Sequence, residues 1–348
     1  MVWASEERIE KYVEVTREIH NSCTTYDVHI HPFEIFFNPQ GYKQDPDLKG
    51  LFSLGNIKYS KPTLKSLKNS LSKQERNLPN MHGSRFLQFF LRRTYFHTGP
   101  FVFRALFDLA RIDKGLLLPV ARGSSSLEQM DLVFQMYSDD KRFCLAGSVP
   151  NSIRNKDIKS FLKTLIDKYT IVAVKAHPNL TGIDLKELAG KERIEWILDA
   201  CSSLNLPLIM HAGRSNHLPG EAGRFAEIEN FKNINLRASI PIIIAHGGAY
   251  GMSSNEIREK VIPVLRELLE TNENLCIDIS GLQYEAICQL VGNIEIERIL
   301  FGSDGLYHDP FVMEMRLLAA LDDANLNIEE SYTKIVSKNI ERRSFRWK

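Results

Sequence analysis

Short apolar segments recur along the chain, and each is followed by a polar or glycine-containing corner and then by a stretch long enough for a helix. This alternation is typical of parallel strands joined by helices. Segments such as LPLIM and IPIIIA are apolar without alternation, as expected of strands covered on both faces. The pattern predicts eight strands, at Tyr26–His31, Gly115–Ala121, Phe143–Ser148, Ile171–His177, Pro207–His211, Pro241–His246, Leu275–Ser280 and Arg298–Asp304.

The segments between these strands carry helical periodicity. Apolar residues at 158, 161, 162, 165 and 166 draw one stripe between the third and fourth strands. Ile257, Val261, Leu265 and Leu268 repeat the pattern between the sixth and seventh. Residues 1–25 are expected to hold a glutamate-rich amphipathic surface helix, which lacks the apolar centre of a signal peptide.

Eight successive strand–helix units predict an α/β fold, a (β/α)8 TIM barrel, whose usual size is about 250 residues. Residues 1–348 then form one domain, and most of the surplus lies in a helical insertion over 32–114, after the first strand. The insertion has two compatible interpretations. It packs on itself and on the barrel, or it forms a lid, because loops that follow barrel strands emerge on the catalytic face.

Composition and net charge limit the kinds of partner that we expect. The chain is 43% hydrophobic and 25% charged, close to the globular average, and its 44 basic and 43 acidic residues give a net charge of +1. No global field attracts nucleic acid or an anionic membrane, and no apolar run is long enough to span a bilayer. The five cysteines are odd in number, widely spaced and form no C-x-x-C pair. This pattern indicates free thiols in a reducing compartment. We therefore expect a cytoplasmic protein with a small-molecule substrate.

Candidate chemistry collects at the strand ends. Five of the ten histidines stand at the C-terminal ends of expected strands, and an acidic residue ends the eighth. In a barrel these ends converge on one pocket, and alternation turns both histidines of DVHIHP to the same side. Imidazole and carboxylate ligands suit zinc and also admit manganese, iron or cobalt. The residues are His29, His31, His177, His211, His246 and Asp304.

The motifs DVHIHP, VKAHP, LIMHAG, IAHGGAYG and LFGSDG, in this order, resemble those of the amidohydrolase superfamily. They are most similar to its amidohydrolase-related branch, which contains aminocarboxymuconate-semialdehyde decarboxylase and related decarboxylases, hydratases and lactonases. The resemblance spans residues 26–345.

The resemblance implies that His29, His31 and His211 bind a divalent metal, most simply zinc, together with Asp304. His246 would be the catalytic or second-site histidine. Asp304 would take a proton from a metal-activated water and pass it to a leaving group, while His246 polarises the scissile carbonyl.

Three further residues keep two interpretations each. In some branches of the superfamily a lysine in the place of Lys175 is carbamylated and bridges two metals; in the related branch the same lysine is a cation for a substrate carboxylate. We favour one metal over two. His177 contacts a second metal or the substrate, or it holds a neighbouring group by hydrogen bonds. Arg214 binds an anionic substrate group, or it forms a salt bridge on its loop.

These features predict a metal-dependent hydrolase that acts on a C–O or C–N bond of a small, carboxylated lactone, ester or amide. The alternative keeps the fold and the metal but makes the enzyme a lyase, a decarboxylase or hydratase of an unsaturated carboxylic acid. A third interpretation is a non-catalytic barrel that serves in binding. Homodimerisation through the insertion is left open.

Overall fold

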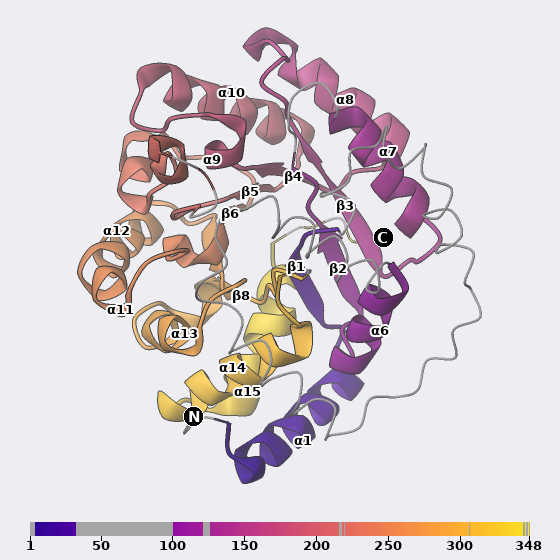
Figure 1. Cartoon of the computed structure of the whole chain (residues 1–348), viewed down its shortest axis with the longest axis vertical. Helices are drawn as coiled ribbons and strands as arrows, with labels where there is room; N and C mark the ends of the chain where they lie inside the picture. The colour runs from indigo at the N-terminus through magenta and orange to yellow at the C-terminus, as the bar shows by residue number, and fades with distance from the viewer. Residues whose placement is uncertain are drawn as a thin grey trace.

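Eight parallel strands follow one another around a single sheet in chain order, with helices outside them (Figure 1). The computed structural model describes residues 4–32, 100–120, 126–215, 218, 220–305, 307–343, 345 and 347. The strands are β1 (Tyr26–Ile30), β2 (Lys114–Leu117), β3 (Phe143–Ser148), β4 (Ala173–Ala176), β5 (Leu208–Met210), β6 (Ile242–Ile244), β7 (Leu275–Asp278) and β8 (Ile299–Leu300). Each lies within a segment predicted from the hydrophobic pattern or overlaps it.

The last strand returns to the first. The main-chain nitrogen of Val28 donates to the oxygen of Phe301 at 3.0 Å, and that of His31 donates to the oxygen of Gly305 at 3.0 Å. A parallel bridge also joins Ile30 to Gly305. The eight strands therefore form a TIM barrel, as the sequence predicts.

The helices alternate with the strands, as right-handed parallel connections require. They are α1 (Glu6–Ser22), α6 (Pro100–Ala110), α7 (Ser126–Tyr137), α8 (Ile158–Tyr169), α9 (Pro178–Thr181), α10 (Leu188–Leu204), α11 (Ser254–Glu256), α12 (Ile262–Thr271), α13 (Tyr284–Val291), α14 (Pro310–Asp323), α15 (Ile328–Thr333) and α16 (Asn339–Glu341). Short 3₁₀ turns are η4 (Asn155–Asp157), η5 (Gly220–Arg224), η6 (Ile228–Asn233), η7 (Ala245–Gly248) and η9 (Ile296–Arg298), and π-helical turns are η8 (Ile257–Val261) and η10 (Lys334–Lys338).

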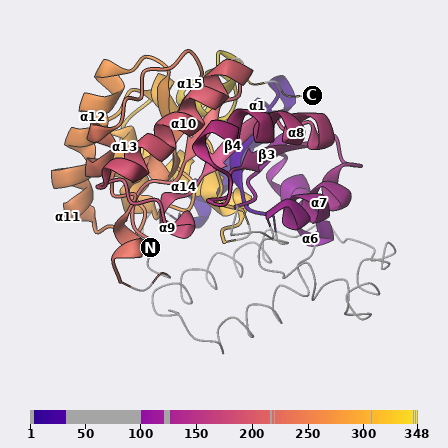
Figure 2. The same cartoon turned by 90° about the horizontal axis from the view of Figure 1, so that it is seen from above.

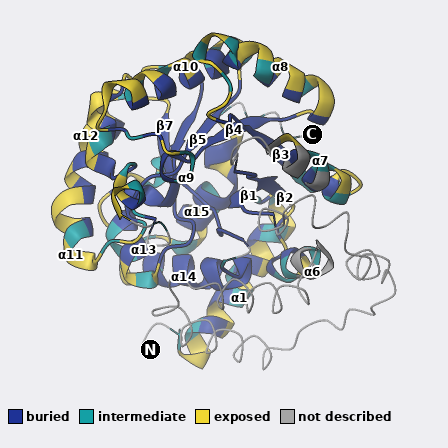
Figure 3. Cartoon of the chain, turned by 45° about the horizontal axis from the view of Figure 1, so that its top comes forward, coloured by how far each residue is buried: buried dark blue, intermediate teal, exposed yellow. Residues whose placement is uncertain are grey.

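The periodic segments become helices where the pattern places them. The stripe after the third strand becomes α8, and the stripe after the sixth becomes η8 followed by α12. Seen at right angles to the first view, α12 and α8 lie on opposite sides, with β3 and β4 between them (Figure 2). The outward faces of these helices are exposed and the strands are buried (Figure 3).

Two buried clusters hold the barrel together. One lies between the strands and the helices, and the other fills the interior with small and branched side chains from all eight strands. The interior residues taken one from each strand are Val28, Leu116, Cys144, Ala173, Ile209, Ile243, Cys276 and Leu300. This packed interior lies beneath the strand ends and supports the polar residues there.

The predicted N-terminal helix is α1, which begins after the N-cap Ser5 and buries one side against α14. Tyr12 donates its hydroxyl proton to Asp322 at 2.8 Å across this contact. Helix α14 is apolar almost all round because it is covered by α1, α6, α13 and α15.

The remaining architectural predictions stay open. Residues 33–99, most of the segment predicted as an insertion or lid over 32–114, lie outside the described residues, and α6 belongs to its described part. The assignment of 1–348 to one domain stays a prediction. Within the described part of the chain, no helix is both long and apolar enough to cross a membrane.

Candidate metal centre

The predicted site residues stand together at the C-terminal ends of the strands. His29 lies in β1, and His31 and His211 directly follow β1 and β5. His246 lies in η7, just after β6, and Asp304 lies in the turn after β8. All five are buried, with at most 6% of each exposed. The barrel therefore gathers residues that are up to 275 positions apart in sequence.

Three acceptor atoms meet in a first cluster. The Nε2 atoms of His29 and His31 are 3.3 Å apart, and Asp304 Oδ1 lies 3.7 Å and 3.5 Å from them. Among the described residues, Asp304 Oδ1 has no hydrogen-bond partner. His31 Nδ1 lies 2.9 Å from the Leu118 carbonyl oxygen, so this nitrogen donates and Nε2 carries the lone pair. Two imidazoles and one orphaned carboxylate oxygen fit a divalent cation.

Lys175 lies at the edge of this cluster. Its side chain is buried, and Nζ is 3.3 Å from His29 Nε2. Burial lowers the pKa of Lys175 to about 8, although Asp278 and Asp304 oppose the change. The lysine is thus placed beside the predicted metal ligands, as both of its sequence interpretations require.

Burial also keeps the imidazoles neutral. Burial, reinforced by the Lys175 ammonium, lowers the pKa of His31 to about 3. The same two causes hold the pKa of His29 well below its ordinary value. Burial raises the pKa of Asp304 to about 7, against the opposing charge of Lys175. A neutral imidazole offers a lone pair, and a bound cation would favour the ionised form of the carboxylate.

A second group lies next to the first. His246 Nε2 is 3.2 Å from His211 Nδ1, and the His177 ring stacks on His211 with centroids 3.9 Å apart. The Ser215 hydroxyl is 3.3 Å from His211 Nε2. His29 joins the two groups, because its ring centroid is 4.7 Å from that of His246. Three of the four predicted ligands thus converge in the first cluster, whereas His211 belongs to the second group.

The backbone is unusual at both predicted catalytic residues. Asp304 has φ +61° and His246 has φ +57°, in the left-handed region that most side chains avoid. The Asp304 main-chain nitrogen donates to the His29 carbonyl oxygen at 2.8 Å, which fixes the turn after β8 against β1. Such strained positions gather at functional sites, where neighbouring structure holds them.

Arg214 lies among carboxylates. Its Nε lies 2.7 Å from Glu227 Oε1 and its Nη2 lies 2.8 Å from Glu256 Oε1. The guanidinium therefore forms salt bridges with its own loop and with α11, as one of the two interpretations from sequence expects. We favour this interpretation, and the binding of an anionic substrate group by Arg214 stays the alternative prediction.

Sequence reasoning missed three residues of the site. Asp278 and Ser280 at the end of β7 hydrogen-bond to His29 and His246, and the Tyr250 ring lies 4.6 Å from that of His246. A signal for the first two was present in LCIDIS, because alternation puts Cys276, which faces the interior, on the same side as Asp278 and Ser280. Tyr250 follows HGGA, and no local pattern marks it.

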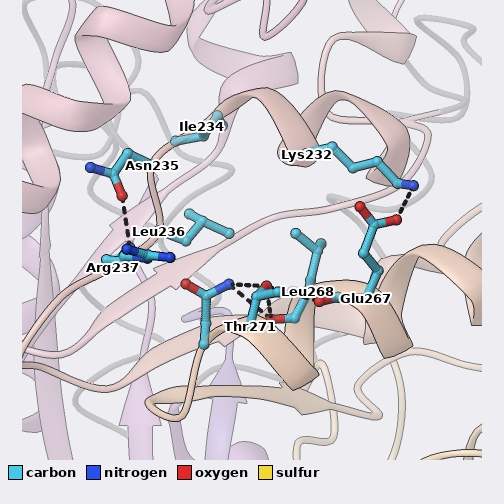
Figure 4. Close-up of a pocket in the computed structure, with 9 residues that line it drawn as sticks. Lys232, Ile234, Asn235, Leu236, Arg237, Glu267, Leu268 and Thr271 are labelled. Carbon is cyan, nitrogen blue, oxygen red and sulfur yellow. Dashed lines mark hydrogen bonds and ion pairs between the residues drawn. The ribbon is translucent and has the colours of Figure 1, made fainter.

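A separate hollow of about 180 Å³ lies among segments that lead into β6 and β7 (Figure 4). It is smaller than the roughly 300–1,000 Å³ of typical ligand pockets, so we assign it no function. Its lining residues are Lys232, Ile234, Asn235, Leu236, Arg237, Glu267, Leu268, Thr271 and Asn272.

Residues 139–338, more than half of the chain, match the sequence model of the family described as amidohydrolase. No curated protein matches the sequence. A similar solved structure is an uncharacterised TIM-barrel protein from Bordetella bronchiseptica, 15% identical over 92% of this chain and 97% of that chain, with a TM-score of 0.52.

A second similar structure is 5-carboxyvanillate decarboxylase from Novosphingobium aromaticivorans, solved with manganese and 4-hydroxy-3-methoxy-5-nitrobenzoic acid. It is 15% identical over 92% of this chain and 96% of that chain, with a TM-score of 0.52. A uronate isomerase from Bacillus halodurans is 12% identical over 96% of both chains, with a TM-score of 0.50. At these identities the likeness shows the fold alone.

Proposed function

Because this chain belongs to the amidohydrolase superfamily and is a metal-dependent enzyme of that kind, we propose that it hydrolyses a C–O or C–N bond in a small, carboxylated lactone, ester or amide. The observation that carries the proposal is the buried Asp304 Oδ1, which has no hydrogen-bond partner in the described part of the chain and faces the Nε2 atoms of His29 and His31. A divalent cation held there supplies Lewis acidity to an oxygen atom.

The protein groups then have separate tasks. Asp304, whose pKa is raised to about 7 by burial, accepts a proton from the attacking water and returns it to the leaving group. His246 donates from Nδ1 to the Ser280 carbonyl oxygen at 2.8 Å, so its Nε2 is an acceptor. We therefore assign His246 to accept a proton or to bind a second cation, in place of the carbonyl-polarising role considered from sequence.

Zinc is the cation we propose, because two imidazoles and one carboxylate suit it, and manganese, iron and cobalt are accepted by the same donors. We propose one ion per chain, held by His29, His31 and Asp304, with His211 as the fourth ligand. A second ion would require His246, His177 and a carbamylated Lys175. The substrate carboxylate is assigned to the Lys175 ammonium.

A second candidate is a decarboxylase. Lys175 Nζ lies 3.3 Å from His29 Nε2, where it would hold a substrate carboxylate against the cation site, and a decarboxylase with bound manganese has the same fold. The reaction would release carbon dioxide, and Asp304 would supply the proton that replaces it.

Elemental analysis of the purified protein, followed by a screen of lactones, amides and unsaturated carboxylates with saturating zinc or manganese, tests the proposal. We expect one metal per chain and hydrolysis of an ester, lactone or amide. Release of carbon dioxide without hydrolysis would favour the decarboxylase. A protein without stoichiometric metal and without turnover would instead support a binding role.

A further inference from the structure

The end of β7 contacts two histidines of the site through the same ring nitrogen. Asp278 Oδ2 lies 2.9 Å from His29 Nδ1, and Ser280 Oγ lies 2.9 Å from the Nδ1 atoms of both His29 and His246. The Ser280 carbonyl oxygen is 2.8 Å from His246 Nδ1. The Nε2 atoms of both rings face other site residues: that of His29 lies 3.3 Å from Lys175 Nζ, and that of His246 lies 3.2 Å from His211 Nδ1.

The direction of these hydrogen bonds is fixed by main-chain N–H groups, which can only donate. Asp278 Oδ1 accepts the main-chain N–H groups of His246 at 2.8 Å and Ser280 at 3.0 Å, and it also accepts the Ser280 hydroxyl proton. The Ser280 oxygen is therefore an acceptor toward the two rings. Because a carboxylate, a carbonyl and a hydroxyl whose proton is already used can only accept, both Nδ1 atoms must donate.

We propose that Asp278 and Ser280 are positioning residues that hold His29 and His246 in the Nδ1–H tautomer. Each ring then keeps its lone pair on Nε2, which faces the first cluster in His29 and His211 in His246. His29, His246 and Asp278 also lie close enough together to hold an ion. However, the nitrogen atoms of His29 and His246 that face Asp278 carry protons, which they donate to oxygen atoms. They therefore have no lone pair to offer a cation on this side. The first cluster, on the Nε2 side of His29, takes the cation.

Asp278→Asn gives a specific test, because the orientation of the new amide is set by the structure. Its carbonyl oxygen must stay at the Oδ1 position, where two main-chain N–H groups donate. The amide N–H₂ then faces His29 Nδ1, which can no longer donate to it. We expect His29 to change to the Nε2–H tautomer, with its proton directed into the first cluster.

The measurement is ¹⁵N NMR of the metal-free protein labelled at histidine, with the His29 signals identified by their loss in His29→Gln. In the unmodified protein, both His29 and His246 should show Nδ1–H. In Asp278→Asn, His29 should show Nε2–H. An Nε2–H signal from either ring in the unmodified protein, or an unchanged His29 in the variant, overturns the proposal. The measurement on the unmodified protein tests the proposal even if the variant does not fold.

Asp27→Asn is a matched control. Asp27 is fully buried like Asp278, and its Oδ1 accepts from the main-chain nitrogens of His29 and Ser303, both at 3.0 Å, without touching the imidazole. The His29 tautomer should stay Nδ1–H. If Asp27→Asn also inverts it, the effect is a general disturbance and the assignment to Asp278 fails.

The consequence for metal binding rests on the proposed function and has its own readout. The zinc affinity of Asp278→Asn, measured by competition with a chelator, should fall by about 10–100-fold, as for other residues that orient metal-binding histidines. An inverted tautomer with unchanged zinc affinity would leave the hydrogen-bond assignment standing. It would refute the proposed role of His29 as a metal ligand.

Discussion

Gly281 stands where any side chain would press on Asp304. Its φ is +64°, and a Cβ built there would lie 2.6 Å from Asp304 Oδ2 and 3.3 Å from both Cβ and Cγ of that residue. Ordinary contacts begin near about 3.5 Å, so Gly281→Ala should move the carboxylate by roughly 1 Å. Rotation gives little relief, because Asp304 is buried and its Cβ and Cγ are also close to the new methyl group.

The expected size follows from that displacement. A shift of about 1 Å in a catalytic group can lower turnover by about 10²-fold, and disturbing a ligand's support weakens metal binding by about 10–100-fold. The left-handed backbone should separately cost about 1–2 kcal/mol of unfolding free energy. Zinc affinity by chelator competition and the unfolding temperature by calorimetry measure the two effects independently.

Gly220→Ala is a control that separates the clash with Asp304 from the strain of a left-handed backbone. Gly220 has nearly the same φ, +65°, but nothing lies within 4 Å of a Cβ built on it. Both variants should lose the stability that the left-handed backbone costs, Gly281→Ala should lose more because of the clash, and only Gly281→Ala should lose metal affinity. Equal zinc affinity in the two variants would refute the reasoning that Asp304 belongs to the metal centre as placed here.

Three other predictions concern charged groups. Burial lowers the pKa of His20, but Glu314 at 3.2 Å, together with the Arg111 carbonyl and Asp113, leaves that pKa above its ordinary value. The ion pair therefore stabilises the fold fully below about pH 6.5, and this stabilisation is lost as the pH rises through the raised pKa. Glu314→Gln should lower the unfolding temperature more near pH 6 than near pH 9. An equal decrease in unfolding temperature at the two pH values would contradict this. Asp304→Asn should reduce turnover by at least about 10²-fold while circular dichroism stays unchanged, and surviving activity would remove Asp304 from proton transfer. Arg214→Ala should lower the unfolding temperature, because Glu227 loses a partner, without raising KM; a higher KM would restore the substrate-binding interpretation.

Much of the fold was predictable because it depends on local periodicity. Apolar runs without alternation marked β5 and β6, and the stripe of α8 followed from residues three and four positions apart. The same regularity placed His29, His31 and Asp304 at strand ends, and a barrel brings strand ends together whatever their separation in sequence.

The candidate site was less predictable where it depends on contacts between loops. Arg214 had two interpretations because nothing near it in the sequence indicates that Glu256 would reach its guanidinium. His20 stands away from any strand end and no local pattern marks it, and only the structure shows its ring beside the buried Glu314. No periodic pattern carries information about such pairs.

By itself, the sequence determined the eight strands, their parallel order and the residues offered to a cation at their ends. Only the tertiary structure decided which of these residues meet and which nitrogen of each imidazole carries the lone pair. It alone also shows that, among the described residues, no group donates a hydrogen bond to Asp304 Oδ1. The two-residue spacing of His29 and His31 turns them to the same side, but the tautomer of His29 depends on Asp278, 249 positions away. Hydrogen bonds of this kind exist only when the barrel is complete, because they join side chains from opposite ends of the chain.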